Sequence, residues 1–267
     1  MSAQKGQYYF TLKGAVARAI KEYKYYTKRP WSLEDVGKFW DTVTDYDDIN
    51  SSLYPYYRRF SNSHKLTKKY LDRDDYKLLD IQTRSGNGTL YWYRKNKIKQ
   101  STCIDFSDYL ISLAKNRLED IEIDINYVKI SNFPLPFKDE SFDFICTYET
   151  IEHIYNYEYF FNELCRVAKK GTIIILTCPN ILWEWVHWLC AIININHSEG
   201  PHKFLRRKSL IKLFNENDVK ILEENSTIVL PFNNKISITI NEMLEKYLPK
   251  KIISLLALRR TFIIRKL

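Results

Sequence analysis

The sequence lacks the features that direct a chain into a membrane or a disulfide-rich fold. Its five cysteines are odd in number and have no metal-ligand spacing, and three of them lie in apolar runs, where a reduced cysteine acts as a small hydrophobic side chain. No run of eighteen apolar residues occurs, so we expect no transmembrane span. The first residues lack the basic, apolar and small-residue order of a signal peptide. We therefore expect a cytoplasmic protein.

Negative charge is scarce at the two ends of the chain. The formal net charge is +9, yet residues 1–30 hold seven Lys/Arg against one Glu, and residues 246–267 hold seven Lys/Arg and no acid. The remainder of the chain is therefore mildly acidic. Such ends suit an anionic membrane surface, an acidic partner or nucleic acid, and ordinary solvated lysines explain them equally well. Peripheral membrane contact through the basic ends is thus one expectation.

Glycine is also scarce, with seven in 267 residues, and two of the seven fall in one turn. A short apolar strand from Tyr76 ends around Asp80, a turn with Gly86 and Gly88 follows, and a helix is expected near 88–96. Glycine lets the backbone approach a ligand closely, and the free N–H groups of a helix start favour a polar or anionic group. This unit is typical of a nucleotide-type site in a doubly wound sheet.

From Tyr76 onward, strand and helix patterns alternate, which predicts an α/β fold with a doubly wound, mostly parallel sheet. We expect strands at 76–81, 102–107, 123–130, 141–147 and 172–178, and helices at 88–96, after Ser107, at 156–168 and at 208–217. Asp105 ends the second strand, where an acid can hold a ribose diol. We expect the last helix at 252–258 and the last strand at 261–264. Alternatively, the segment 252–258 docks on a membrane surface.

No strand pattern precedes Tyr76, so residues 1–75 are expected to form a helical cap. Leu12 to Lys28 has apolar residues at helical spacing, and Ser32 is a plausible N-cap for a second helix. The arginine–tyrosine cluster at 54–60 suits either a ligand carboxylate or a packed surface.

Taken together, the motifs resemble those of class I S-adenosylmethionine-dependent methyltransferases, in the branch that acts on small molecules and lipids. In chain order they are Leu79-Asp80-Ile81 with Gly86-Asn87-Gly88-Thr89, Ile104-Asp105-Phe106-Ser107, Leu135-Pro136-Phe137 with Ser141-Phe142-Asp143, Glu149 to His153, Lys169-Lys170-Gly171, Thr177-Cys178-Pro179-Asn180, and Gly200 to Phe204. The resemblance covers roughly residues 50–230. It implies a Rossmann-like methyltransferase domain over 76–267, with a lid insertion at about 181–203.

The resemblance also implies the cofactor, S-adenosylmethionine, and the residues that would bind it. Those residues are Asp80, Ile81, Arg84, Ser85, Gly86, Gly88, Asp105, Phe106, Ser131, Asn132, Phe133 and Tyr148. In the family's terms, the glycine turn contacts the methionine part, Asp105 the ribose, and Tyr148 the sulfonium. Phe106 flanks the adenine, and the loop from Ser131 to Phe133 lines its edge.

Two departures from the family pattern concern this site. Gln82, Thr83 and Arg84 stand where further glycines are usual, and Ser131 stands where an aspartate commonly accepts the adenine amino hydrogen. Bulky side chains after the strand would crowd the cofactor, or Arg84 would turn inward to pair with the cofactor's carboxylate or with Asp80. These departures keep open the alternative of a non-catalytic, methyltransferase-like binding protein.

His153 and His202 are the candidate catalytic residues, because transfer to a hydroxyl requires removal of a proton. Glu149 and His153 share a face if their segment is helical. Glu149, Glu152, His153 and His202 also suit a divalent ion, but the Glu-x-x-Glu-His run is common in the branch without a metal, so a metal is not favoured.

Ile181 to Ile195 is rich in tryptophan and lies where the family places substrate-recognition insertions, so either it contacts a hydrophobic substrate or it only packs on the sheet. We expect O-methylation of a small, hydrophobic or lipid-like molecule. A nicotinamide oxidoreductase is disfavoured, because no third glycine follows Gly88 at the required spacing. Nucleic acid is not favoured as a partner, because Cys178-Pro179-Asn180 replaces the motif expected for base methylation.

Overall fold

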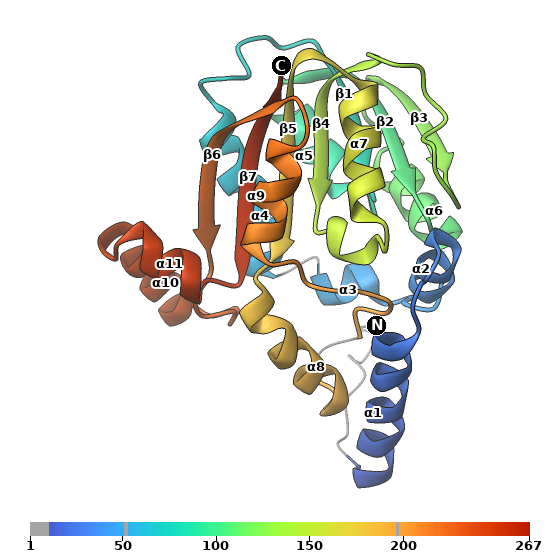
Figure 1. The fold of residues 1–267 in the computed structure, drawn as a ribbon, viewed down its shortest axis with the longest axis vertical. Coiled ribbons are helices and arrows are strands. Elements are labelled where there is room, and N and C mark those ends of the chain that lie inside the picture. The colour runs from blue at the N-terminus through green and yellow to red at the C-terminus, as the bar shows by residue number, and fades with distance from the viewer. Residues whose placement is uncertain (1–10, 51–52, 196–197) are drawn as a thin grey trace.

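A computed structural model describes residues 11–50, 53–195 and 198–267, so part of the basic N-terminal end and residues 196–197 of the expected lid lie outside the described residues. The centre of the fold is a seven-stranded sheet in the order β3-β2-β1-β4-β5-β7-β6, in which every strand except β7 runs in the same direction (Figure 1). The strands are β1 (Tyr76–Ile81), β2 (Ile98–Asp105), β3 (Asp124–Lys129), β4 (Phe142–Tyr148), β5 (Ala168–Pro179), β6 (Val219–Thr227) and β7 (Arg259–Lys266). The α/β class and the mostly parallel, doubly wound sheet are confirmed.

Helices cover both faces of the sheet, and four of them precede β1. They are α1 (Leu12–Thr27), α2 (Leu33–Trp40), α3 (Tyr46–Asn50), α4 (Tyr54–Thr67), α5 (Asn87–Arg94), α6 (Asp108–Arg117), α7 (Tyr157–Val167), α8 (Glu184–Ile192), α9 (Arg207–Asn215), α10 (Lys235–Tyr247) and α11 (Lys250–Leu256), with short 3-10 turns at Ile151–His153 and Ile181–Trp183. In the view of Figure 1, α7 and α9 lie in front of the sheet, and α1 and α8 project together below it. Strands β1 to β5 are parallel to one another, so their carboxyl ends all lie at that lower end.

Local sequence explains why the elements begin and end where they do. Ser32 forms a capping box with Asp35 at the start of α2, and Ser107 accepts a hydrogen bond from the amide of Leu110 at the start of α6. The middle of β4 and most of β5 are buried, as the strands at the centre of a covered parallel sheet require. Both N-caps were predicted from the sequence.

The starts of two strands differ from the prediction, and a third strand was not predicted. β2 begins at Ile98 rather than at 102, because its first half carries the exposed Lys99 and Gln100 and so has no apolar pattern. β5 begins at Ala168, so Lys169–Gly171, expected to close a helix, lies within the strand instead. β6 was not predicted, since an edge strand such as Val219–Thr227 needs few buried residues. The expected last strand at 261–264 is confirmed as part of β7.

Helix α2 lies directly over the turn that joins β2 to α6. A Cβ atom added to Gly37 would lie 2.1 Å from the carbonyl oxygen of Phe106, so only glycine allows this approach. Just after α2, Asp41 accepts hydrogen bonds from the hydroxyl of Ser107 at 2.6 Å and from the amide of Tyr109 at 3.2 Å. These contacts attach the helices before β1 to the carboxyl edge of the sheet.

Replacing Gly37 by alanine should therefore destabilise the protein although alanine is the better helix former. We expect a loss of about 1–3 kcal/mol in the free energy of unfolding, measured by urea titration, because the backbone of Phe106 must shift. Gly14→Ala in α1 is the control: its Cβ would meet the N-cap hydroxyl of Thr11 and the end of the Arg18 side chain rather than a backbone atom, so the loss should be smaller than at Gly37. Equal stability of the two variants would contradict the close contact between α2 and Phe106.

Candidate functional site

The turn after β1 has a backbone conformation that glycine adopts most easily. Gln82 and Arg84 have φ values of 51° and 54°, and Gly86, which precedes α5, has a φ of 79°. Left-handed backbone costs a residue with a Cβ atom about 1–2 kcal/mol. The chain therefore keeps the glycine-type turn while adding two large polar side chains to it.

Asp80 holds this turn from the end of β1. Its Oδ2 accepts hydrogen bonds from the amide and hydroxyl of Thr89, at 3.0 and 2.8 Å, and from the hydroxyl of Thr83 at 3.0 Å. A Cβ on Gly88 would lie 2.9 Å from the same oxygen, so this glycine is required by the carboxylate. Burial raises the pKa of Asp80 to about 6.

Asp105, at the end of β2, faces the same turn. Its Oδ2 accepts the amide hydrogen of Arg84 at 2.8 Å, and its Oδ1 accepts those of Phe106 and Ser107 at 2.8 and 3.0 Å. The carboxylate is fully buried beneath α2, and burial raises its pKa to about 6. The two acids predicted from strand ends thus lie on either side of one turn.

The remaining residues predicted to bind the cofactor fall into buried and open groups around this turn. Ile81, Ser85 and Phe106 are buried. The loop after β3 begins beside Asp105, because the amide of Ile130 donates to the Asp105 carbonyl at 3.0 Å. The next residues, Ser131 and Asn132, are exposed, and Phe133 is half-buried.

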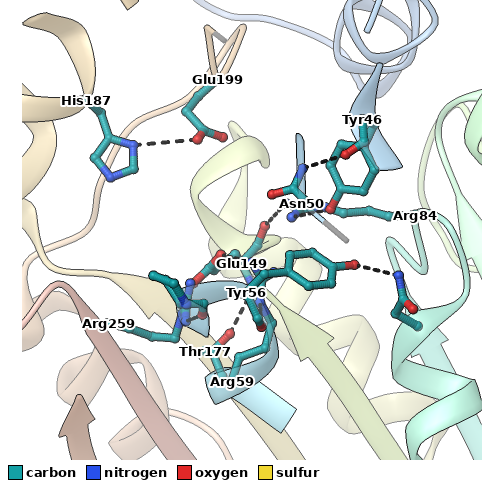
Figure 2. A network of polar contacts seen from close by, with 12 residues as sticks. Tyr46, Asn50, Tyr56, Arg59, Arg84, Glu149, Thr177, His187, Glu199 and Arg259 are labelled. Atoms are coloured by element: carbon teal, nitrogen blue, oxygen red, sulfur yellow. Dashed lines mark hydrogen bonds and ion pairs between the residues drawn. The ribbon is translucent and has the colours of Figure 1, made fainter. Parts of the chain in front are cut away.

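A cavity of about 460 Å³ lies beside the turn, at the carboxyl ends of β4 and β5. We call it the arginine cavity, because Arg59 of α4, Arg84 of the turn and Arg259 of β7 all line it together with Glu149 (Figure 2). Its other lining residues are Trp40, Tyr46, Asn50, Leu53, Pro55, Tyr56, Trp183, Val186, His187, Cys190, Ile195, Glu199, Pro231, Phe232, Asn233 and Leu258.

Glu149 is the centre of the polar network in this cavity. Its side chain pairs with Arg259 through Oε1 and with Arg59 through Oε2, the latter at 3.0 Å. These cations outweigh the effect of burial and hold the pKa of Glu149 at about 2. The amide of Glu149 donates to Thr177 of β5, which fixes the backbone of the network to the sheet.

Arg84 turns into the cavity, but it does not pair with Asp80. Its Nη2 donates to the backbone carbonyl of Glu149 at 2.8 Å, and its Nη1 donates to the hydroxyl of Tyr46 at 3.2 Å. The guanidinium also lies 5.3 Å from the ring centroid of Trp40. The prediction of a pair with Asp80 is therefore wrong, and neutral oxygens and aromatic rings surround this cation.

Tyr148 and the two predicted catalytic histidines do not line the arginine cavity. The hydroxyl of Tyr148 accepts a hydrogen bond from Trp92 Nε1 at 3.0 Å. His153 is buried, with Nδ1 3.2 Å from the carbonyl oxygen of Pro201, and burial lowers its pKa to about 3. His202 lies in a second cavity, of about 370 Å³, between α1 and α8.

The segment from Glu149 to His153 is not a regular helix. Glu149 has a φ of 54°, and the helical part of the segment is one 3-10 turn, Ile151–His153. The condition under which Glu149 and His153 would share a helical face is therefore not met. In the described residues, no three His, Cys, Asp or Glu side chains gather in a way that could hold a metal ion.

Sequence reasoning did not single out His187, Glu199 or Arg259 as residues of a site, although all three line the cavity. Glu199 lies between two histidines, with Oε1 3.5 Å from His187 Nδ1 and Oε2 3.9 Å from His153 Nε2. Arg59 of the 54–60 cluster is buried, lines the cavity and pairs with Glu149, and the alternative that this cluster holds a ligand carboxylate stays a prediction. The sequence did contain an indication for Arg259, because an arginine next to a buried apolar strand needs a polar or charged partner.

Comparison with known proteins gives one family match. A family model described as "Methyltransferase domain" matches residues 79–176. An uncharacterized protein of Methanocaldococcus jannaschii is 28% identical over 118 residues, which are 44% of this chain and 47% of that protein. A demethylmenaquinone methyltransferase of Halalkalibacterium halodurans is 27% identical over 73 residues, 27% of this chain and 30% of that protein. The chain thus spans less than half the length of these curated relatives.

Solved structures share the fold over nearly the whole chain. The cyclase SpnF superposes with a TM-score of 0.65 at 13% identity, covering 88% of this chain and 97% of that one. A geranyl diphosphate C-methyltransferase of Streptomyces coelicolor superposes with a TM-score of 0.60 at 12% identity, covering 88% and 98%. The strand order and the acid-flanked turn agree with the match of residues 79–176 to a methyltransferase domain, and the solved structures share the α/β fold of this chain.

Proposed function

We propose that this protein transfers a methyl group from S-adenosylmethionine to a hydroxyl oxygen of a small, hydrophobic molecule. The observation that carries the proposal is the turn flanked by Asp80 and Asp105, which opens beside the arginine cavity. The printed names of a relative and of a structural neighbour, a demethylmenaquinone and a geranyl diphosphate methyltransferase, support a small-molecule acceptor.

The residues around the turn fit the cofactor chemically. Both polar atoms of the Gln82 amide are buried without a hydrogen-bond partner among the described residues, which suits a polar ligand on the turn. Asp105 and Asn132 add acceptors for a ribose and an adenine. Because α2 covers Asp105, we infer that α2 shifts when the ribose binds.

When bound, S-adenosylmethionine supplies an electrophilic methyl group. The chain's own residues must then exclude water, orient the acceptor and take its proton. We propose that His187 takes this proton in the arginine cavity, oriented by Glu199. Catalytic roles for His153 and His202 stay predictions: His153 lies behind Glu199, and His202 lies in the neighbouring cavity.

We further propose that the lower end of the molecule contacts an anionic lipid surface, consistent with a lipid-like acceptor. Most of the exposed large apolar side chains belong to α1, α8, α10 and α11, which lie at this end in Figure 1. They are Leu12, Val16, Ile20, Tyr23, Tyr26, Trp185, Trp188, Leu189, Ile236, Ile240, Met243, Tyr247, Ile252, Leu255 and Leu256. Exposed lysines flank them on α1, α10 and α11, as in helices that lie in a membrane interface. No helix in the described ranges is both long and apolar enough to cross a bilayer.

Calorimetric titration with S-adenosylhomocysteine tests the cofactor site. We expect Asp105→Asn to weaken binding by about 10–100-fold, because it removes a charged acceptor of the ribose hydroxyls. Asp108→Asn is the matched control: this acid is nearby but exposed and pairs with Lys129, so its loss should leave affinity unchanged. Absence of binding to the folded wild-type protein would instead favour the non-catalytic alternative.

The same affinity should depend on pH. The pKa of Asp105 is about 6 in the free protein, and ribose hydroxyl donors would lower it in the complex, so protonation opposes binding. Affinity should fall as the pH drops below 6, by at most about tenfold per pH unit for this one group. A pH profile that is unchanged in Asp105→Asn would contradict the assignment of Asp105 to the ribose.

Cosedimentation with vesicles tests the lipid surface. We expect binding to vesicles of phosphatidylcholine with phosphatidylglycerol, weaker binding to phosphatidylcholine alone, and weakening by salt. Trp185→Glu combined with Leu255→Glu should abolish binding, whereas Leu267→Glu, at an exposed residue beside the opposite end of the sheet, should not. Wild-type protein that stays in solution, or that dimerises through this end, would contradict the proposal.

A further inference from the structure

The arginine cavity holds more positive than negative charge in its polar half. Arg59 and Arg259 are both paired with one carboxylate, that of Glu149. Arg84 makes no ion pair within 4.0 Å in the part of the chain that the structure describes, and its nearest partners are the Tyr46 hydroxyl and a backbone carbonyl. Three buried guanidinium groups therefore share a single directly bound carboxylate.

Arg84 is the member of this group that can take a ligand. It is 7% exposed, it lines the cavity, and its buried Nε has no hydrogen-bond partner among the described residues. The carboxylates of Glu149 and Glu199 favour the charged form of Arg84 from a distance, but neither forms an ion pair with it within 4.0 Å, so an anion bound directly to the guanidinium would offset the remaining cost of its desolvation. The planar guanidinium also matches a carboxylate or phosphate group in geometry.

Apolar side chains also line the cavity. They include those of Leu53, Trp183, Val186, Ile195, Phe232 and Leu258. A volume of about 460 Å³ is within the usual range for sites that bind small organic molecules. The cavity thus combines a cationic end, formed by Arg59, Arg84 and Arg259, with an apolar wall from α8 and the segment before α10.

We propose that the arginine cavity binds an acidic amphiphile, with a carboxylate or phosphate head on Arg84 and an apolar body along Trp183 and Phe232. That this molecule is the methyl acceptor rests on the proposed function, whereas its binding does not. The acidic group would occupy the cationic end beside Glu149, and the apolar body would extend away from the sheet toward the exposed apolar helices.

Calorimetry with three ligands of equal chain length tests the site: dodecanoate, dodecyl phosphate and dodecanol, each below its aggregation limit and without cofactor. We expect one or both acids to bind at least about tenfold more tightly than the alcohol, the expected gain from a charge-assisted hydrogen bond to a guanidinium. Which acid binds more tightly identifies the head group. Equal affinity for the alcohol, or no binding of either acid, would overturn the proposal.

A variant pair assigns the effect to Arg84. Arg84→Gln should lose most of the preference for the acids and keep the affinity for dodecanol, whereas Arg94→Gln, at an exposed arginine on α5, should change neither. If Arg84→Gln does not fold, the comparison of the two acids with the alcohol in the wild-type protein still shows whether the cavity prefers an acidic head group.

A last experiment tests whether dodecanoate binds at an acceptor site or at the cofactor site. Dodecanoate binding that persists in protein saturated with S-adenosylhomocysteine supports an acceptor site. Loss of that binding would assign Arg84 to the carboxylate of the cofactor and overturn the proposal. If the protein binds S-adenosylhomocysteine but no amphiphile, this inference is rejected and the proposed transferase activity is not. If it binds the amphiphile but no S-adenosylhomocysteine, the proposed transferase activity is rejected and this inference is not.

Discussion

The buried carboxylate of Glu149 is the interaction on which the arrangement of the site depends. It connects α4 through Arg59 and β7 through Arg259, while its backbone connects the turn after β1 through Arg84 and β5 through Thr177. A carboxylate between two guanidinium groups remains charged even when it is buried, as the pKa of about 2 reflects. Segments far apart in the chain are thereby held around one cavity.

The turn after β1 has a backbone conformation that suits glycine, yet it carries other side chains. Gln82 and Arg84 adopt the left-handed conformation at a cost of about 1–2 kcal/mol each, and Asp80 and Asp105 hold the turn in place through hydrogen bonds. The result is a turn that still presents its amides to a ligand but also directs a guanidinium into the neighbouring cavity. That added charge distinguishes the chemistry of this cavity from that of an apolar pocket.

Polar and apolar features meet at the carboxyl edge of the parallel strands. The acids and the arginines lie at the strand ends, while α1, α8, α10 and α11 surround that edge with exposed apolar side chains (Figure 1). Parallel strands place their functional residues at one edge in any doubly wound sheet. Here the helices before and after the sheet extend that edge into a surface suited to hydrophobic molecules.

The sequence by itself determined the α/β class, the first strand, the two strand-end acids, the glycine turn and the N-caps at Ser32 and Ser107. These features depend on local patterns, because apolar periodicity, glycine and capping residues act over a few neighbouring positions. The family resemblance added the identity of the domain, and the family match and the shared fold bear it out.

Only the tertiary structure decided which charges meet. Arg59, Glu149 and Arg259 are separated by up to 200 residues in the chain, so no spacing rule could pair them, and the partner of Arg84 depended on where Tyr46 came to lie. The edge strand β6 and the position of α2 over Asp105 were likewise set by packing. Ion pairs and packing between distant segments form only when the chain has folded, and a local sequence pattern does not contain that information.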